Sequence, residues 1–514
     1  MKKRTIKEHI VLHPVMSFML LILATIIISF ILNIFGFSAT YNKINETTLE
    51  YASTTESVTS VLNLRGVKYI FANTVSNFAN FTVLSQLIIV LLGIGVMEYS
   101  GFLKTAVGLL TRHARKNIVT YVIVLLGLLS SIIGNMPFLA LIPLAALIFK
   151  YGKRNPNLGI IAAFSSLTCG MGLSVFFTSV DSALSKLTVS SANILDSAYT
   201  FKSISLMLIM TVAIITLSFV ITYITENVIV RKLPKYNFEE EEEEGKFVVT
   251  KPQAKGLVLA GIGSIIYLLI IIYNMIPYLP FSGNFLNYQE SLYIDKLFGA
   301  NSFFADGFVF VITLLFVIWG LLYGIGSKSI NNNREFIDSL GYSLNGVGKT
   351  MVFIFASATL ISIFKYSNIG NTITAFLANL VADSGFSGLA LVILLFVVSI
   401  ISTFFVPTSV LKWEIMASPI VPIFLNAGLS AEFCQTVFRF GECVTIGLTP
   451  VFAYFVVYMA YLERYNQDKN FFGLRNAIKY QLPYSIATFI ILLVIIIVWY
   501  ILSLPLGFGG TVYL

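Results

Sequence analysis

A few ionisable side chains interrupt the apolar parts of this sequence, and they are the first candidates for chemistry. Asp181 follows a break in one apolar stretch, and Arg439 and Glu442 lie in another. A charged group inside an apolar segment is costly, so it indicates a function such as binding a solute or carrying an ion. Arginine suits a carboxylate because its guanidinium donates two parallel hydrogen bonds. We therefore expect Arg439 to bind an acidic group and Asp181 to carry a cation or a proton.

Each of these residues also has a structural interpretation that the sequence leaves open. Arg439 and Glu442 are three residues apart, so on a helix they share a face and can form an ion pair. Such a pair can be purely structural, or it can orient Arg439 toward a ligand. Asp181 can instead be a loop residue whose carboxylate reaches water. Trp413 can stack on an aromatic ligand or lie at a membrane interface. Its position just after an interruption of an apolar stretch favours the ligand-binding role.

Neutral polar side chains lie at the same interruptions and can hydrogen-bond a solute. They are Asn135, Thr408, Ser409 and Thr445. The three histidines and three cysteines show no metal-ligand spacing, so we expect no metal centre and no cofactor. A coupling Na⁺ near Asp181, or near the tips of the two re-entrant hairpins predicted below, is compatible with this. The sequence does not decide between Na⁺ and H⁺ as the coupling ion.

Composition identifies the environment in which these residues act. The chain has 514 residues, of which 57% are hydrophobic and 11% are charged, and its mean hydropathy is +0.86. Soluble proteins carry about 25% charged residues, so soluble enzymes and nucleic-acid-binding proteins are excluded. The net charge of +8 comes from short basic clusters between apolar runs, which is typical of membrane proteins. The motifs of metalloproteases, serine hydrolases and phosphate-binding loops are missing from the sequence, and we predict that the protein is not an enzyme.

The apolar stretches predict an all-α polytopic membrane protein. About 20 apolar residues cross a bilayer as a helix. Seven continuous stretches meet this length: residues 15–37, 82–98, 203–225, 256–277, 305–325, 348–364 and 482–504. Two others, 158–190 and 432–464, are interrupted by Gly, Pro and polar residues, and we interpret them as broken spans. Together these stretches predict nine transmembrane helices.

Two further apolar stretches, residues 118–149 and 388–420, are long but divided by a break in the middle. Basic residues lie on both sides of the first, including Lys116 and Lys150, so both of its ends belong on one side of the membrane. We therefore predict that each stretch is a re-entrant hairpin. With nine spans, the distribution of basic clusters places the N-terminus in the cytoplasm and the C-terminus outside the cell membrane.

The order span, hairpin, broken span occurs twice along the chain. Residues 1–225 form an N-terminal half and 256–514 a C-terminal half, joined by a cytoplasmic acidic linker, 226–255, that contains Glu239–Glu244. The ends of the two hairpins fall on opposite sides, which predicts an inverted repeat. Broken segments at matching positions of such repeats indicate the binding site of a transporter, because unpaired backbone groups inside a membrane are tolerated where they line a cavity.

Two segments of the C-terminal half carry a resemblance to a known family. Residues 408–417 read T-S-V-L-K-W-E-I-M-A, and residues 435–445 read Q-T-V-F-R-F-G-E-C-V-T. They resemble the motifs S-A-S-A-K-W-A-I-M-A and Q-A-A-Y-R-I-G-D-S-x-T of the AbgT family of p-aminobenzoyl-glutamate transporters. Further matches lie in the N-terminal half, at His13-Pro14 and at residues 93–101. The likeness covers most of the chain in order.

The resemblance implies a homodimer whose subunits each have nine spans and two hairpins. It also implies ion-coupled movement of p-aminobenzoyl-glutamate across the cell membrane and, in some members, export of sulfonamide antimetabolites. Asp181, Trp413, Arg439 and Glu442 fall on positions that the family uses at its central site. We therefore expect a secondary active transporter in which Arg439 contacts a carboxylate and Trp413 an aryl group. Its expected partners are a small anionic solute, the lipid bilayer and a second copy of the chain.

Several polar positions depart from the family pattern. Ile446 and Ser174 stand where the family has asparagines, Val410 replaces a serine, and Asn135 replaces an aspartate, whereas Glu442 keeps the charge of an aspartate. These departures favour the alternative of a transporter of the same fold for a different carboxylate, an amino acid or a short peptide. A membrane-embedded enzyme and a passive channel are weaker alternatives, and saturable uptake would exclude the channel.

Overall fold

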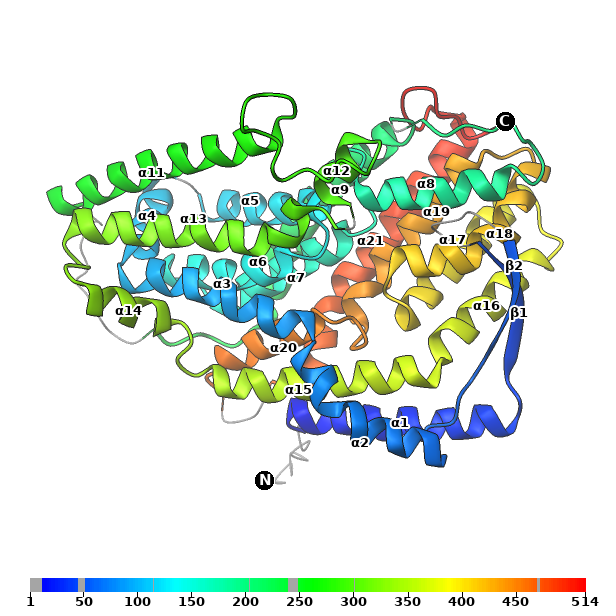
Figure 1. The fold of residues 1–514 in the computed structure, drawn as a ribbon, viewed down its shortest axis with the longest axis horizontal. Helices are drawn as coiled ribbons and strands as arrows, with labels where there is room; N and C mark the ends of the chain where they lie inside the picture. The colour runs from blue at the N-terminus through cyan, green and yellow to red at the C-terminus, as the bar shows by residue number, and fades with distance from the viewer. Residues whose placement is uncertain are drawn as a thin grey trace, which may run out of the picture.

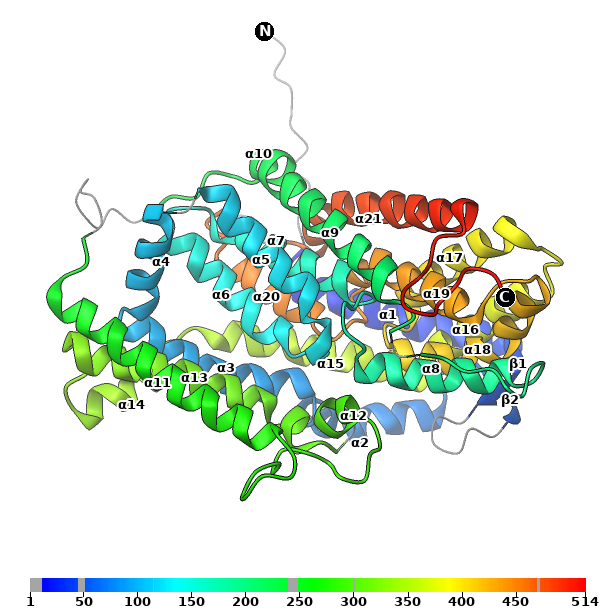
Figure 2. The same ribbon diagram turned by 90° about the horizontal axis from the view of Figure 1, so that it is seen from above.

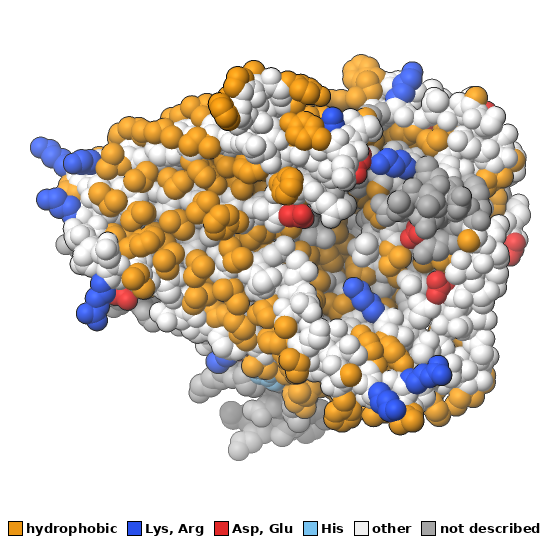
Figure 3. All heavy atoms as spheres, in the orientation of Figure 1, with side chains coloured by type: hydrophobic (Ala, Val, Ile, Leu, Met, Phe, Trp, Pro, Cys, Tyr) orange, Lys and Arg blue, Asp and Glu red, His pale blue; other side chains and the backbone are white. Residues whose placement is uncertain are grey.

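The computed structural model describes residues 12–44, 51–113, 115–202, 204–238, 248–299, 301–468 and 472–514. Figure 1 shows an elongated, mainly helical molecule. At one end α3 (Thr82–Tyr99), α11 (Lys251–Met275) and α13 (Phe303–Ser327) pack side by side, and a β-hairpin lies at the other end (Figures 1 and 2). Hydrophobic side chains cover a broad surface over α11 and α13, beyond which Lys and Arg side chains gather (Figure 3). Such a surface suits contact with lipid.

Nine helices of the described residues are long and apolar enough to cross a membrane, which agrees with the predicted number. They are Pro14–Ile34, Leu64–Tyr99, Lys116–Ile133, Met207–Lys232, Lys251–Met275, Phe303–Ser327, Val347–Ser367, Gly388–Phe405 and Leu474–Leu502. Seven of them overlap the seven continuous stretches. The other two are first arms of the predicted hairpins, because the broken spans fold into helices that are each too short to be counted.

The first predicted hairpin consists of α5 (Lys116–Leu129), a 3₁₀ turn (Ser130–Ile133) and α6 (Pro137–Tyr151). Gly134 has a positive φ of 64°, which a residue with a side chain rarely adopts, and Pro137 begins α6, where a proline needs no amide donor. Arg154 Nη1 donates to the Lys116 carbonyl at 3.2 Å, so the two ends of the segment lie together. The chain therefore folds back on itself, while the re-entrant position in a membrane stays a prediction.

The second predicted hairpin consists of α17 (Gly388–Phe405) and α18 (Ser409–Asn426). The break at residues 406–408 contains Pro407, and the residue before a proline disfavours helical backbone. Thr449 Oγ1 and Thr445 Oγ1 donate to carbonyls of Phe404 and Ile400, respectively, at 2.7 Å each, so the end of the first arm is held by the second broken span.

The broken spans form the core of the molecule. The first is divided into α7 (Pro156–Gly170) and α8 (Ser179–Ala192), and the second into α19 (Ala431–Thr445), a 3₁₀ turn (Ile446–Leu448) and α20 (Phe455–Arg464). Every residue of α7 is buried, and so is nearly every residue of α19. A helix that is enclosed on all sides must satisfy its polar side chains within the protein. The two broken spans are therefore the parts of the chain in which buried charges can be paired.

The remaining elements enclose this core. They are α1 (Pro14–Ile34), α2 (Leu64–Ala79), α4 (Phe102–His113), α9 (Met207–Ile224), a π-helical turn (Thr225–Ile229), α10 (Val230–Lys232), α12 (Tyr293–Phe298), α14 (Asn333–Tyr342), α15 (Val347–Ser367), α16 (Ile369–Ala382) and α21 (Leu474–Leu502). The predicted linker 226–255 is partly helical, in the π-helical turn, in α10 and at the start of α11. Its run Glu239–Glu244 lies outside the described residues.

A short β-hairpin is one of the elements that the sequence reasoning missed. β1 (Ser38–Ile44) and β2 (Tyr51–Ser57) pair antiparallel, with Ser38 opposite Ser57. Ala39 and Tyr41 of β1 pack against Ala375 of α16 and Ile415 of α18. The hairpin thus lies over the second arm of the predicted second hairpin, and the fold is helical apart from this pair of strands.

Candidate functional site

The interruptions of the hairpins and broken spans meet around a cavity of about 530 Å³. The break between α5 and α6 contributes Ser131 and Asn135, and the break between α17 and α18 contributes Thr408 and Ser409. Arg439 lines the cavity from α19. The junction of α15 and α16 forms another wall, which the sequence did not predict. The structure therefore brings together the breaks that sequence reasoning treated as one site, and the binding role of their residues stays a prediction.

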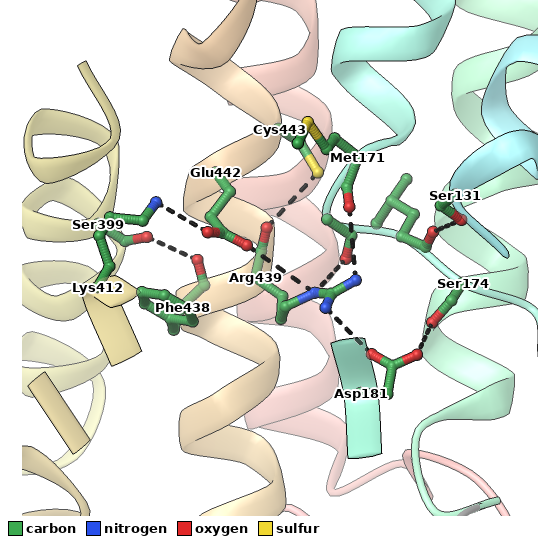
Figure 4. A network of polar contacts seen from close by, with 12 residues as sticks. Ser131, Met171, Ser174, Asp181, Ser399, Lys412, Phe438, Arg439, Glu442 and Cys443 are labelled. Atoms are coloured by element: carbon green, nitrogen blue, oxygen red, sulfur yellow. Dashed lines mark hydrogen bonds and ion pairs between the residues drawn. The ribbon is translucent and has the colours of Figure 1, made fainter. Parts of the chain in front are cut away.

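Arg439 reaches from α19 to the break of the first broken span. Its Nε donates to the Gly172 carbonyl at 3.0 Å, and its Nη1 lies 3.1 Å from Asp181 Oδ1 (Figure 4). The side chain is 1% exposed. Gly172 permits this approach, because a Cβ at that position would lie 2.1 Å from the Arg439 carbonyl oxygen. The absence of one side chain thus allows the two broken spans to meet.

Asp181 is held at the N-terminus of α8 by a capping box. Thr178 Oγ1 accepts from the Asp181 amide at 3.1 Å, and Asp181 Oδ2 accepts from the Thr178 amide at 3.0 Å. The same oxygen accepts from the hydroxyls of Ser174 and Thr178, both at 2.7 Å. The helix N-terminus also favours a negative charge. Both carboxylate oxygens therefore face donors or a cation within the protein. The spacing Thr-x-x-Asp signalled this arrangement in the sequence.

Glu442 pairs mainly with a residue outside the sequence-based site, Lys412 of α18. Lys412 Nζ lies 2.8 Å from Glu442 Oε1, whereas Arg439 Nε lies 3.9 Å from Glu442 Oε2 (Figure 4). Lys412 also donates to Thr403 Oγ1 at 2.5 Å. The pairing of Arg439 with Glu442 expected from helical spacing is present, but packing of α18 against α19 brings a second cation, Lys412, closer to Glu442.

These four side chains form a buried row of alternating charge, Lys412, Glu442, Arg439 and Asp181, that links α18, α19 and α8. The two cations and two anions sum to zero. An unpaired buried charge costs several kcal/mol, so the row is stable only as a neutral set. Arg439 is the member that also lines the cavity, and a solute would therefore meet the row at its guanidinium.

Trp413 is not among the residues that line the cavity, and its predicted stacking on a solute stays a prediction. Its side chain is fully buried, its ring lies 4.4 Å from that of Phe438, and its Nε1 donates to Thr188 Oγ1 at 2.8 Å. Thr188 donates in turn to Gln435 Oε1 at 2.6 Å. Trp413 thus joins α18 to α8 and α19.

Thr445 also has a structural contact where a ligand contact was predicted. Its hydroxyl donates to the Ile400 carbonyl of α17, as described above, and it does not line the cavity. Asn135, Thr408 and Ser409, in contrast, line the cavity as expected.

Sequence reasoning missed an aromatic wall of the cavity. Phe138 follows the break before α6, and its ring stacks on Tyr454 at 5.3 Å and meets Phe452 edge-on at 5.1 Å. All three line the cavity. Aromatic rings in such arrangements provide a rigid apolar face for another ring. The segment 449–454 contains no periodic pattern that would have predicted this arrangement.

Lys365 directly follows the apolar stretch 348–364, a position typical of a residue at a membrane interface. The structure places Lys365 in the wall of the cavity, in the last turn of α15. The change follows from Asn368, whose left-handed backbone (φ 56°) ends α15 and starts α16. The chain thus turns at this point inside the protein.

Comparison with known proteins finds relatives that are similar over most of the chain. Over 499 residues, which are 97% of this chain and 94% of the relative, the chain is 25% identical to the p-aminobenzoyl-glutamate transport protein of Escherichia coli strain K12. Two solved structures are also similar. The YdaH transporter of Alcanivorax borkumensis is 24% identical, and the match covers 96% of this chain and all of that chain. MtrF of Neisseria gonorrhoeae, from a class of antimetabolite efflux pumps, is 26% identical, and the match covers 98% of each chain. The TM-score is 0.48 for both structures.

The sequence profile of a single family spans almost the whole chain, from residue 7 to residue 514. The members of this family and the Escherichia coli relative are described as transporters and not as enzymes. The chain belongs to the AbgT putative transporter family.

Proposed function

We propose that the protein is an ion-coupled secondary active transporter of p-aminobenzoyl-glutamate-like anions across the cell membrane. The observation that carries this proposal is the position of Arg439. It lines a cavity between the helix breaks of the two predicted hairpins, and it belongs to a buried neutral row of charges. The name of the Escherichia coli relative supports the choice of solute.

In this proposal a solute carboxylate binds the guanidinium of Arg439. The guanidinium is already directed at the Asp181 carboxylate, and Nη1 makes no hydrogen bond of good geometry among the described residues. It is therefore a donor that a second carboxylate can use. The aryl ring of the solute packs on the wall formed by Phe138, Phe452 and Tyr454, which takes the role that sequence reasoning gave to Trp413.

Charge balance gives a reason for ion coupling. The row of four charges is neutral, so an added carboxylate leaves one uncompensated negative charge in a buried site. A proton on Asp181 or Glu442, or a Na⁺ near them, restores neutrality. Solute and cation would then bind together and be released together as the hairpins and broken spans move as one body against the other helices. The protein would act as a homodimer with its N-terminus in the cytoplasm.

The test is uptake of radiolabelled p-aminobenzoyl-glutamate into proteoliposomes, with imposed Na⁺ and proton gradients in separate arms. Saturable uptake driven by one gradient supports the proposal and identifies the coupling ion. Arg439→Ala is expected to abolish uptake, whereas Arg475→Ala, which removes an exposed arginine at the start of α21, is expected to leave it unchanged. Full uptake by Arg439→Ala protein would refute the role of Arg439.

A different carboxylate, amino acid or short peptide is the second candidate solute. Ser174, which replaces a family asparagine, donates to Asp181, and Ile446, which replaces another, is 1% exposed. Close to the site, Ser174 has a shorter side chain than the family's asparagine, and Ile446 has an apolar one. If p-aminobenzoyl-glutamate is not transported by a well-folded protein, a thermal-stabilisation screen of carboxylates, amino acids and peptides separates this candidate from the first.

A further inference from the structure

Lys365 is a second cation in the wall of the cavity. It lies in the last turn of α15, its side chain is exposed, and no carboxylate of the described residues lies within ion-pairing distance of it. Among the described residues that line the cavity, Lys365 and Arg439 are the cations, and none is an aspartate or a glutamate. The cavity therefore offers two basic groups to a solute.

The two cations differ in what surrounds them. Arg439 is buried and belongs to the neutral row, so its charge is already balanced by Asp181 and Glu442. Lys365 has no such partner among the described residues, and its charge gives the cavity a net positive field. Asn368, which also lines the cavity, donates its side-chain amide to Glu56 Oε2 of β2 at 2.6 Å, and Glu56 does not line the cavity. An anionic group opposite Lys365 would have to come from the solute.

We propose that Lys365 binds a second anionic group of the solute, and that the cavity thereby selects solutes with two carboxylates over those with one. One carboxylate contacts Arg439, the second contacts Lys365, and the aryl ring, which the amide joins to the glutamate, packs on the aromatic wall. This inference rests on the proposed function and adds to it the residue that determines specificity.

A purely structural role for Lys365 makes a different prediction. A lysine in the last turn of a helix interacts favourably with the helix dipole, whatever the solute. Loss of that interaction would affect all solutes equally. Binding of a second carboxylate affects only the solute that carries it, so a matched pair of solutes separates the two roles.

The experiment compares uptake of p-aminobenzoyl-glutamate, a dianion, with uptake of p-aminobenzoyl-glutamine, in which an amide replaces the side-chain carboxylate. The variants are Lys365→Gln, Lys365→Arg and, as a control on the same helix, Lys349→Gln, which removes an exposed lysine outside this cavity. For a partly exposed ion pair, Lys365→Gln is expected to raise the KM of the dianion about threefold to fivefold. The KM of the monoanion should change less than about twofold, and Lys365→Arg should resemble the wild type.

Each other outcome has a defined meaning. Equal losses for both solutes in Lys365→Gln protein, with a monodisperse elution profile, would overturn the inference in favour of a structural role. Unchanged KM values for both would also overturn it, while the proposed function would stand. Failure of the wild type to take up either solute would refute the proposed function itself, and the inference about Lys365 with it.

Discussion

Lys412→Met tests whether the buried row of charges is held together by balance. The substitution keeps the length of the side chain and removes its charge, which leaves Glu442 with only the 3.9 Å contact to Arg439. The row then carries one net negative charge. At 2.8 Å and an effective dielectric constant of about 20, the lost attraction is about 6 kcal/mol, part of which the desolvation of both groups offsets. We expect the variant to lose about 3–5 kcal/mol of stability.

A second substitution distinguishes charge balance from packing. Lys412→Met combined with Glu442→Met removes both partners and leaves Arg439 paired with Asp181, so the row is neutral again. The double variant is expected to recover most of the lost stability, since replacing a buried pair by apolar side chains is often nearly neutral. Lys186→Met is the matched control. Its Nζ lies 3.6 Å from Asp295, but its side chain is 48% exposed, so about 0–1 kcal/mol is expected.

Thermal unfolding in detergent, followed by circular dichroism at several heating rates, gives the order of the midpoints. The expected order places Lys412→Met well below the wild type, with the double variant and Lys186→Met close to the wild type. A Lys412→Met midpoint equal to that of the wild type would refute the reasoning, because it would mean that Glu442 needs no cation. A double variant less stable than the single one would show that packing, and not charge, dominates.

Two further substitutions test contacts that the broken spans make, one with α18 and one with each other. Trp413→Phe removes the hydrogen bond from Nε1 to Thr188 Oγ1 and is expected to cost about 1 kcal/mol of stability. The KM of aromatic solutes should stay unchanged. A KM that rises selectively for aromatic solutes would support the stacking role of Trp413 instead. Gly172→Ala places a Cβ 2.1 Å from the Arg439 carbonyl oxygen and is expected to abolish uptake or folding, whereas Gly348→Ala, whose added Cβ meets nothing within 4 Å, should be tolerated. Uptake and elution profiles of the two proteins check this. Normal uptake by Gly172→Ala protein would contradict the close approach of the broken spans.

The sequence was sufficient for the class of protein, for most helices and for the places where they break. Apolar run length is a property of neighbouring residues, and so is the interruption of a helix by residues such as Gly134 or Pro407. The family also followed from the sequence, since the motifs around Trp413 and Arg439 are local strings. The β-hairpin was missed because its strands are short and polar, and they are stabilised by packing on α16 and α18.

The partners of the charged residues were not determined by the sequence alone. Helical spacing correctly placed Arg439 and Glu442 on one helix face, but the shorter contacts come from Lys412 and Asp181, which lie on other helices. Trp413 is buried between helices, and Lys365, at the end of an apolar stretch, lines the cavity. Spacing along a chain gives distances within one helix, whereas contacts between helices depend on how the whole set packs. The sequence therefore determined which residues are chemically capable, and the tertiary structure decided which of them meet.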